Sequence, residues 1–399
     1  MRRALVSGGS AVCLLTCACG ANPNLLRHPA APASFPAPDV AITPVDRSTD
    51  VRLDKPVTVT SFAGALYAVA VHTNHDQRLP GRLSDNHRAW TSTVGLEPAT
   101  RYLVDVVADG PHGDVTTAET SFTTMAADRL TTDVTPADGD VVGVGMPITL
   151  RFNADIPSER QAAFLSHVTV QSTPPVSGSW HWFRDNEVHW RPADFWPSGT
   201  HVTVTANLRG IAAADGVWGF ADWTSSFTVG PKHLSLVDVA THEMQVFEND
   251  QLIETWPISA GRASLPTISG TLYVPYKSPD VLMDSLTLGI PRTSPDGYYE
   301  HVFWNTAISV DGFYVHAAPW SEGQQGFENV SHGCVNLSTD RAITFFNWSQ
   351  VGDVVVVKNS SRVADYGDGE GDWQIPSDQF SNSGGSVAVP DIPHHPGGI

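Results

Sequence analysis

Between residues 40 and 230 the chain consists of short runs in which apolar and polar residues alternate. Residues 57–60 (VTVT) and 201–205 (HVTVT) are clear examples. A period of two places successive side chains on opposite faces of a strand. The pattern therefore predicts many short strands and little helix in this part of the chain.

The same part of the chain is an internal repeat. The offset between the copies grows from about 92 to about 105 residues, which is expected if the second copy carries longer loops. Copies of this length with several short strands predict two tandem immunoglobulin-like β-sandwiches, at 39–125 and 126–230. The matched pairs are 42–44 and 134–136, 55–59 and 146–150, Trp90 and Trp190, and 121–123 and 226–228.

From residue 231 the pattern restarts and predicts a third, β-rich domain at 231–358. Residues 273–299 are rich in proline and turns, which indicates a hairpin flap rather than buried core. Residues 338–340 (STD) are typical of a helix start, with an apolar face expected at Ala342, Ile343, Phe346 and Trp348. The expected strands are 234–239, 243–247, 252–258, 302–308, 312–316 and 351–358.

Both ends of the chain differ from these domains. Residues 1–19 begin with two arginines and a short apolar run, as in a secretory signal, and end in a sequence that resembles a bacterial lipobox. In that motif Cys19 would carry the lipid, because Ala18 supplies the small residue at the cut. An Ala/Pro-rich linker is expected at 20–38 and a C-terminal extension at 359–399. The extension is expected to dock through Trp373, Ile375 and Phe380 and to be disordered from 381 onward.

Composition and charge narrow the function. The chain is rich in Trp, Phe, Val, Thr, Gly and Pro and poor in Lys and Glu, which favours strands and turns. Its net charge of -19 argues against nucleic acid as a partner, because phosphates need a basic surface.

The cysteines single out one position. Cys13, Cys17 and Cys19 lie in the signal, so the mature domains keep one thiol, Cys334. A lone cysteine in an exported protein either couples to a partner or carries out chemistry. His316 follows an apolar strand-like run upstream, which is the arrangement of a thiol nucleophile and its base. The alternative is a buried structural cysteine beside incidental histidines.

Two other clusters contain residue types that form binding sites. His72, His75 and His87 lack the close spacing of metal ligands, so no metal site is predicted. The tryptophans of the second copy are interpreted as core and interdomain packing rather than as a sugar site. They are Trp180, Trp182, Trp190 and Trp196.

The third domain resembles the catalytic domain of bacterial L,D-transpeptidases. The resemblance rests on YVH at 314–316, SHGCVN at 331–336, the opening strands through Ser259-Ala260-Gly261, and GDWQIP at 371–376. The whole mature layout resembles a family form with a lipobox, two immunoglobulin-like modules and a C-terminal extension. The resemblance implies 3→3 peptidoglycan cross-linking: a tetrapeptide stem is attacked at its third residue, D-Ala leaves, and another stem's amine receives the acyl group.

The resemblance and the chemistry together assign roles to the site. Cys334 would be the nucleophile and His316 its base, oriented by the backbone carbonyl of Ala317. The oxyanion would be held by the N–H groups of Gly333 and Cys334 and by a flap tyrosine, Tyr298, or its neighbour Tyr299. The residues expected to contact the substrate or shape the loop are Ser331, His332, Asn336, Met283 and Trp320. No metal or organic cofactor is required, and carbapenem β-lactams are expected to acylate Cys334.

Other functions remain open from the sequence. Water as the acceptor would make an L,D-carboxypeptidase, and a protein amine would make an enzyme that anchors proteins to the wall. A non-catalytic wall-binding lipoprotein is the alternative of another class. We expect the protein at the outer face of the plasma membrane, held by its lipid, with the two modules acting as a stalk into the wall.

Overall fold

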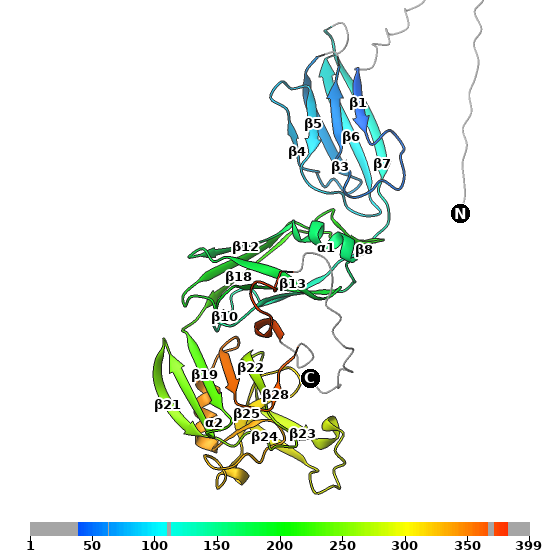
Figure 1. The fold of residues 1–399 in the computed structure, drawn as a ribbon. Helices are drawn as coiled ribbons and strands as arrows, with labels where there is room; N and C mark the ends of the chain where they lie inside the picture. Colours follow the sequence, from blue (N-terminus) through cyan, green and yellow to red (C-terminus); the bar gives the residue numbers. More distant parts are fainter. Residues whose placement is uncertain (1–38, 63, 110–112, 366–370, 382–399) are drawn as a thin grey trace, which may run out of the picture.

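The structure is a computed structural model and describes residues 39–62, 64–109, 113–365 and 371–381. Figure 1 shows three β-rich domains in chain order, with the N-terminal domain at the top and the third at the bottom. In the described residues, no helix has the length and apolar character needed to cross a membrane. The predicted signal with Cys19, the linker at 20–38 and the end of the chain from 382 lie outside the described residues.

The first domain is a sandwich of two antiparallel sheets around one apolar core. Its four-stranded sheet has the order β1-β2-β5-β4 and its three-stranded sheet the order β3-β6-β7. The strands are β1 Val40–Thr43, β2 Thr58–Ser61, β3 Leu66–Thr73, β4 Gly81–Leu83, β5 Ala89–Ser92, β6 Arg101–Asp109 and β7 Val115–Thr123.

The second domain pairs two four-stranded sheets, β10-β18-β15-β12 and β13-β14-β11-β9, with a small sheet β16-β17-β8 at the first domain's side. Its one described helix is α1, Ser158–Leu165. The strands are β8 Asp128–Arg129, β9 Thr132–Thr135, β10 Val141–Val142, β11 Ile148–Phe152, β12 Val168–Thr173, β13 Gly178–Arg184, β14 Glu187–Pro192, β15 His201–Ala206, β16 Ala212–Ala214, β17 Val217–Trp218 and β18 Trp223–Val229.

The repeat seen in the sequence is a repeat of structure. Trp90 on β5 pairs with Val59 on β2, and Trp190 on β14 pairs with Ile148 on β11. Both tryptophans are buried, so each domain has an indole at the equivalent position of its core. No described cysteine lies in either copy, so each sandwich rests on its apolar core.

The tryptophans interpreted as packing are indeed core residues for the most part. Trp182, Trp190 and Trp196 are buried in the second domain, and Trp180 packs against the same core. His72 sits 3.0 Å from the Asp105 carboxylate on the neighbouring strand. Within the described ranges, no group of three or more His, Cys, Asp or Glu gathers as metal ligands do.

The third domain has two sheets with a helix packed against them. The six-stranded sheet has the order β21-β20-β19-β27-β22-β28, and the four-stranded sheet the order β23-β24-β25-β26. The strands are β19 His233–Asp238, β20 Glu243–Glu248, β21 Gln251–Pro257, β22 Ile268–Tyr273, β23 Lys277–Asp284, β24 Tyr299–Ala307, β25 Tyr314–Ala317, β26 Val335–Leu337, β27 Val354–Lys358 and β28 Arg362–Val363; the 3₁₀ turns are η1 Ser285–Leu288, η2 Pro319–Ser321 and η4 Gly371–Gln374.

Helix α2, Thr339–Trp348, follows the predicted STD start, but its buried face differs from the expected one. Ala342 and Phe345 are its buried residues, whereas Ile343 and Phe346 are half-buried. Phe345 meets the ring of Trp256 at 6.3 Å and Phe346 meets Trp304 of β24 at 5.5 Å. The helix therefore contacts both sheets, and this two-sided packing widens the apolar face beyond a single stripe.

The flap begins later than the sequence predicts. Tyr273 is buried at the end of β22, a core strand that alternation did not reveal. The flap proper is the β23–β24 hairpin, in which Val281 pairs with Val302. Lys277 at its base donates to the carbonyls of Phe346 (2.6 Å) and Ser349 (2.5 Å), which satisfies the end of α2.

The second and third domains share a joint. Gly143 and Gly145 donate their N–H groups to the carbonyls of Val351 and Gly352, both at 2.8 Å. A Cβ at Gly143 would lie 2.2 Å from the Asp353 nitrogen, so only glycine allows this backbone contact. Tyr273 and Val354 of the third domain also belong to the second domain's core cluster. The two domains therefore pack as neighbours with no solvent layer between these backbones.

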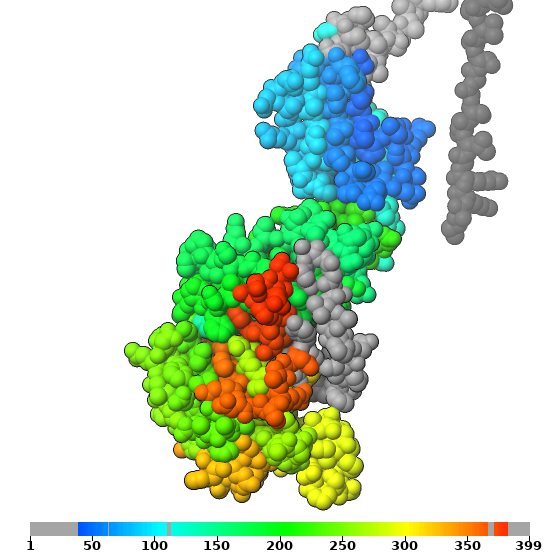
Figure 2. Space-filling view, viewed as in Figure 1, coloured from blue at the N-terminus to red at the C-terminus, as the bar shows by residue number. Residues whose placement is uncertain are grey.

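Residues 371–381, here called the C-terminal strap, close this joint from outside. The strap lies between the second domain and the third domain's β22, as Figure 2 shows in red. Trp373 donates to the Gly145 carbonyl at 2.7 Å, and Phe380 is buried. Ile375, also singled out by the sequence, is buried as well.

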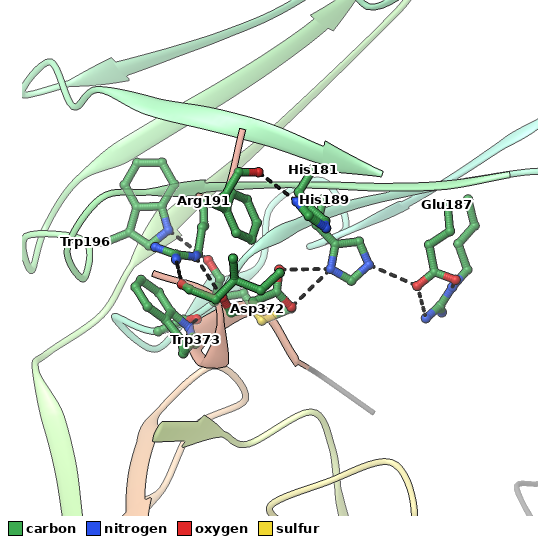
Figure 3. A network of polar contacts seen from close by, with 12 residues as sticks. His181, Glu187, His189, Arg191, Trp196, Asp372 and Trp373 are labelled. Atoms are coloured by element: carbon green, nitrogen blue, oxygen red, sulfur yellow. Dashed lines mark hydrogen bonds and ion pairs between the residues drawn. The ribbon is translucent and has the colours of Figure 1, made fainter. Parts of the chain in front are cut away.

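Three side chains of β13 and β14 hold the strap (Figure 3). His189 lies 3.0 Å from the buried carboxylate of Asp372 and 2.9 Å from Glu187. Arg191 donates to the carbonyls of Asp372 (3.0 Å) and Ile375 (2.6 Å). His181 lies 2.7 Å from the Phe380 carbonyl oxygen. The strap is thus bound by buried, charge-assisted contacts.

Candidate active site

Two neighbouring strands bring Cys334 and His316 together. Strand β25 runs parallel to β26, with Val315 opposite Val335 and His316 opposite Asn336. Cys334 directly precedes β26. Because side chains alternate along a strand, Val315 points into the core while Tyr314 and His316 share the other face.

Two backbone groups, at Gly312 before β25 and at Tyr314 in β25, lie close to the thiol of Cys334. Cys334 is a half-buried free cysteine, and its Sγ lies 3.7 Å from the Gly312 carbonyl oxygen. Burial raises the pKa of the Cys334 thiol to about 11, although a hydrogen bond from the Tyr314 backbone opposes this shift. The resting thiol is therefore protonated at neutral pH and needs a base to react.

His316 is held in one orientation. It is 3 % exposed, and its Nδ1 lies 2.9 Å from the Ala317 carbonyl oxygen. Since a carbonyl can only accept, Nδ1 carries the proton and Nε2 is left with its lone pair. Burial lowers the pKa of His316 to about 4, so the ring is neutral and able to accept a proton. The indole of Trp320, itself mostly exposed, lies 6.1 Å from the imidazole.

The loop before Cys334 is shaped by Ser331. Its hydroxyl donates to the Cys334 carbonyl at 2.6 Å and accepts the Gly333 N–H at 3.1 Å. Gly333 has a φ of +130°, and a Cβ there would lie 2.8 Å from the Phe313 ring. The predicted Gly333 N–H is thus occupied by Ser331 and would have to leave that bond to reach an oxyanion.

Asn336 stabilises the floor of the site. Its Nδ2 donates to the Ser321 hydroxyl at 3.0 Å, and its backbone pairs with Ser259. Asn336 is buried, and its amide joins β26 to the turn η2 that carries Trp320.

The flap places two tyrosines differently. Tyr298 packs edge-on against His332, with ring centroids 4.9 Å apart. Burial, and next the charge that Cys334 gains when it ionises at alkaline pH, raise the pKa of Tyr298 to about 12, so its hydroxyl keeps its proton. Tyr299 is 55 % exposed and lies under the guanidinium of Arg292. Of the two tyrosines, Tyr298 is the one on the thiol's side.

The remaining predicted residues occupy the rim. His332 Nε2 lies 3.1 Å from the Asp296 carbonyl oxygen and 3.2 Å from Arg262 Nη1, so it links the flap to the loop. Met283 is half-buried on β23 opposite Glu300. Within the described part of the chain, Met283 makes no hydrogen bond or ring contact with the thiol or the histidines.

The sequence did not reveal several groups that surround the thiol. Gly312 and Tyr314 act through backbone atoms, which leave no side-chain pattern to find. The Tyr314 hydroxyl also lies 2.6 Å from that of Tyr276. The position of Tyr314 two residues before His316 is the sequence feature that could have marked it as part of the site. Arg262 lies far away in sequence, directly after the Ser259-Ala260-Gly261 strand end.

Two family models match the chain. A bacterial Ig domain matches residues 48–212, and an L,D-transpeptidase catalytic domain matches residues 232–357. These matches, with the fold described above, define a transpeptidase whose catalytic domain follows immunoglobulin-like modules. The mainly β fold class predicted from the sequence is confirmed.

Relatives with known names extend over most of the chain. L,D-transpeptidase 2 of Mycobacterium tuberculosis (strain CDC 1551 / Oshkosh) is 37 % identical over 350 residues, covering 87 % of this chain and 85 % of that protein. L,D-transpeptidase 5 of M. tuberculosis (strain ATCC 25618 / H37Rv) is 33 % identical over 356 residues, covering 86 % of this chain and 76 % of that protein. The chain belongs to the L,D-transpeptidase family, as its resemblance predicted.

A solved structure is similar to part of the chain. The structure of LD transpeptidase LdtMt1 in complex with imipenem is 33 % identical, with a TM-score of 0.51. The similarity covers 58 % of this chain and 99 % of that one.

Proposed function

We propose that this transpeptidase forms 3→3 peptidoglycan cross-links through a thioester at Cys334. The observation that carries the proposal is the pair of strands β25 and β26. Cys334 directly precedes β26, and the adjacent strand β25 carries a neutral histidine whose Nδ1 lies 2.9 Å from the Ala317 carbonyl oxygen. This is the arrangement that acyl transfer through a thiol requires.

In the first half-reaction the Cys334 sulfur attacks the carbonyl carbon of the donor stem's third residue. His316 Nε2 takes the thiol proton as the S–C bond forms. The tetrahedral intermediate then breaks its C–N bond, and His316 returns the proton to the leaving nitrogen of D-Ala. A thioester remains on Cys334, and the net charge of the pair is unchanged.

In the second half-reaction a neutral side-chain amine of another stem attacks the thioester carbonyl. His316 takes a proton from that nitrogen, the C–S bond breaks, and the proton returns to the sulfur. The product is an amide between the third residues of two stems. Both half-reactions begin with a proton acceptor. The low pKa of His316 keeps its ring neutral, and so able to accept a proton, at the start of each.

The oxyanion of both intermediates needs hydrogen-bond donors. The Cys334 N–H and the protonated Tyr298 hydroxyl are our assignments, and the Gly333 N–H joins them if Ser331 releases it. Trp320 and Met283 would line the substrate's path, while Ser331, His332 and Asn336 hold the loop in place.

A β-lactam would enter the same half-reaction. The relative named LdtMt1 is known in complex with imipenem, a β-lactam. We propose that Cys334 opens such a ring in the same way that it attacks the donor amide. The ring nitrogen then takes the proton that D-Ala would otherwise receive.

The proposal places the protein in the cell envelope. The lipobox-like sequence at 15–20 motivates lipidation of Cys19, and the two immunoglobulin-like domains would carry the catalytic domain away from the membrane. No cofactor is required by this chemistry. The same site would act as an L,D-carboxypeptidase with water, or as a protein-anchoring enzyme with a protein amine.

Mass spectrometry of products separates these functions. Full-length protein incubated with tetrapeptide stems is expected to give cross-linked dimers and free D-Ala, and Cys334→Ala is expected to give neither. Tripeptide without dimer would mean a carboxypeptidase. If a folded protein gives no product and no β-lactam adduct, the non-catalytic wall-binding alternative holds and the proposal is wrong.

A further inference from the structure

Arg262 is anchored beside the catalytic loop by its backbone. Its N–H donates to the Ser331 carbonyl at 3.0 Å, and Gly261 forms a bridge with the same serine. A Cβ at Gly261 would lie 2.3 Å from the Leu265 carbonyl oxygen, so this close backbone approach requires glycine. The base of the Arg262 side chain is therefore held at the loop that carries Cys334.

The guanidinium of Arg262 reaches the junction of loop and flap. Nη1 lies 3.2 Å from His332 Nε2, and Nη2 lies 3.1 Å from the carboxylate of Asp296 on the flap. Nε donates to Ser264 at 3.0 Å. The Arg262 side chain is 24 % exposed and that of Asp296 is 59 % exposed, so the ion pair can open to solvent without disturbing the core.

The contact between Arg262 and His332 has a competitor. His332 Nε2 also lies 3.1 Å from the Asp296 carbonyl oxygen, and a single ring nitrogen cannot donate to that oxygen and accept from Arg262 at once. Burial, and next the charge of Arg262, lower the pKa of His332, so the ring stays neutral beside the guanidinium. An N–H of Arg262 is therefore available for a further acceptor.

Arg262 is also a cation close enough to Tyr298 to lower the pKa of its hydroxyl. Arg292 is bound to Asp284 and covers Tyr299, on the outer side. Lys277 is occupied by the end of α2. Around Tyr298, Glu300 and Asp284 add negative charge and Arg262 offsets it. A negatively charged ligand in this acidic protein would be drawn to this guanidinium.

We propose that Arg262 binds the α-carboxylate of the donor stem's terminal D-Ala, an inference that rests on the proposed function. The leaving nitrogen carries this carboxylate one carbon away, so it must enter the site close to Cys334. A planar guanidinium matches a carboxylate with two parallel hydrogen bonds. In the free protein the Asp296 carboxylate occupies this position and is displaced by the substrate.

The proposal is tested by binding in full-length protein with Cys334→Ala, so that no turnover occurs. Calorimetry compares a tetrapeptide stem ending in D-Ala acid with the same stem ending in the carboxamide. Arg262→Gln is expected to weaken binding of the acid by about 10- to 100-fold, the range for a charge-assisted contact, and to leave the amide unchanged. Arg262→Lys is expected to retain part of the preference.

A second variant tests the role of Asp296 and does not depend on the first. Asp296→Asn removes the competing carboxylate and is expected to tighten binding of the acid by up to about 5-fold, as for an exposed ion pair. Arg341→Gln, on the first turn of α2, is the matched control and is expected to change neither stem's affinity.

Two results would overturn the proposal. An equal loss for acid and amide in Arg262→Gln would mean that Arg262 only ties the flap to the loop. An unchanged acid preference would mean that another group reads the carboxylate. Failure of the proposed function is seen separately: the wild type would give no cross-linked dimer by mass spectrometry even if the binding preference were present.

Discussion

At the scale of single residues, Cys334 and His316, the proposed nucleophile and base, are both uncharged in the resting protein. Burial sets this state for each, with the thiol pKa at about 11 and the imidazole pKa at about 4. A neutral pair costs less to bury than an ion pair, because neither group loses the hydration of a charge. In the proposed reaction, proton transfer would therefore accompany attack on the substrate and not precede it.

This state predicts the pH dependence of thiol alkylation. In the wild type, the rate with iodoacetamide is expected to keep rising with pH up to about 11, without a plateau near neutrality. His316→Gln is expected to leave this alkaline rise in place but to slow cross-linking by about 10²- to 10⁴-fold. A plateau at acidic to neutral pH that disappears in His316→Gln would reveal a preformed ion pair instead.

The sequence predicted these two residues because they carry side-chain chemistry in a short motif. Ala317 followed from the family resemblance, and the structure places its carbonyl at the imidazole. Gly312 and Tyr314 contact the thiol through backbone atoms, and only the folded turn brings them there. Residue identity therefore reveals which groups react, whereas the chain path decides what surrounds them.

At the scale of elements, the C-terminal strap and strand β14 form a buried charged network. Burial acts to lower the pKa of His189, but Asp372 and Glu187 outweigh it and raise that pKa to about 10. Burial likewise acts to raise the pKa of Glu187, but hydrogen bonds from His189 and Arg151 outweigh it and bring it to about 2. His189 is therefore charged when the strap is docked.

This charge predicts how stability depends on pH. Because the folded pKa of His189 lies above its unfolded value, its contribution is complete below about 6.5 and is lost as pH rises through about 10. The melting temperature of the wild type, measured by calorimetry, is expected to fall as the pH rises over that interval. Asp372→Asn is expected to lower the melting temperature at neutral pH and to flatten the alkaline slope; an unchanged slope in that variant would contradict the assignment.

Element boundaries were harder to predict than element types. The start of α2 was predicted at the right place, with Ser338 as the N-cap residue, although its hydroxyl contacts the Asp340 carboxylate and caps no backbone N–H. Its buried face was misjudged, since Phe345 and Phe346 pack against different sheets. Strand β22 was missed because both of its faces are partly covered, which removes the alternation that marks a half-exposed strand.

At the scale of the whole molecule, the second domain is part of the catalytic unit, whereas the first is further away. The glycine joint, the shared core and the strap all connect the second and third domains. The core of the first domain gains only Trp218 among its buried residues from the second domain. Cutting the chain between the first and second domains should therefore lower stability less than cutting it between the second and third.

Two truncated chains test this difference. A chain beginning at residue 126 keeps the joint and the strap and is expected to melt close to the full-length protein and to form a β-lactam adduct. A chain beginning at residue 231 exposes Tyr273, Trp373 and Phe380 and is expected to melt lower or to aggregate. Equal melting temperatures for the two truncated chains, measured by calorimetry, would rule out a shared unit. A spacer role is best tested by removing the first domain alone.

The position of the strap at the end of the chain has a consequence for the order of synthesis. His189 and Arg191 are made long before Asp372, so a growing chain holds these two side chains on β14 without the strap residues that they later contact. Their burial is complete only after residue 380 has been added. A chain that ends before residue 371, through a shortened message or a proteolytic cut, keeps Cys334 and His316 but loses every contact of the strap with the second and third domains. The packing of these two domains against each other therefore depends on synthesis of the chain beyond its proposed catalytic residues.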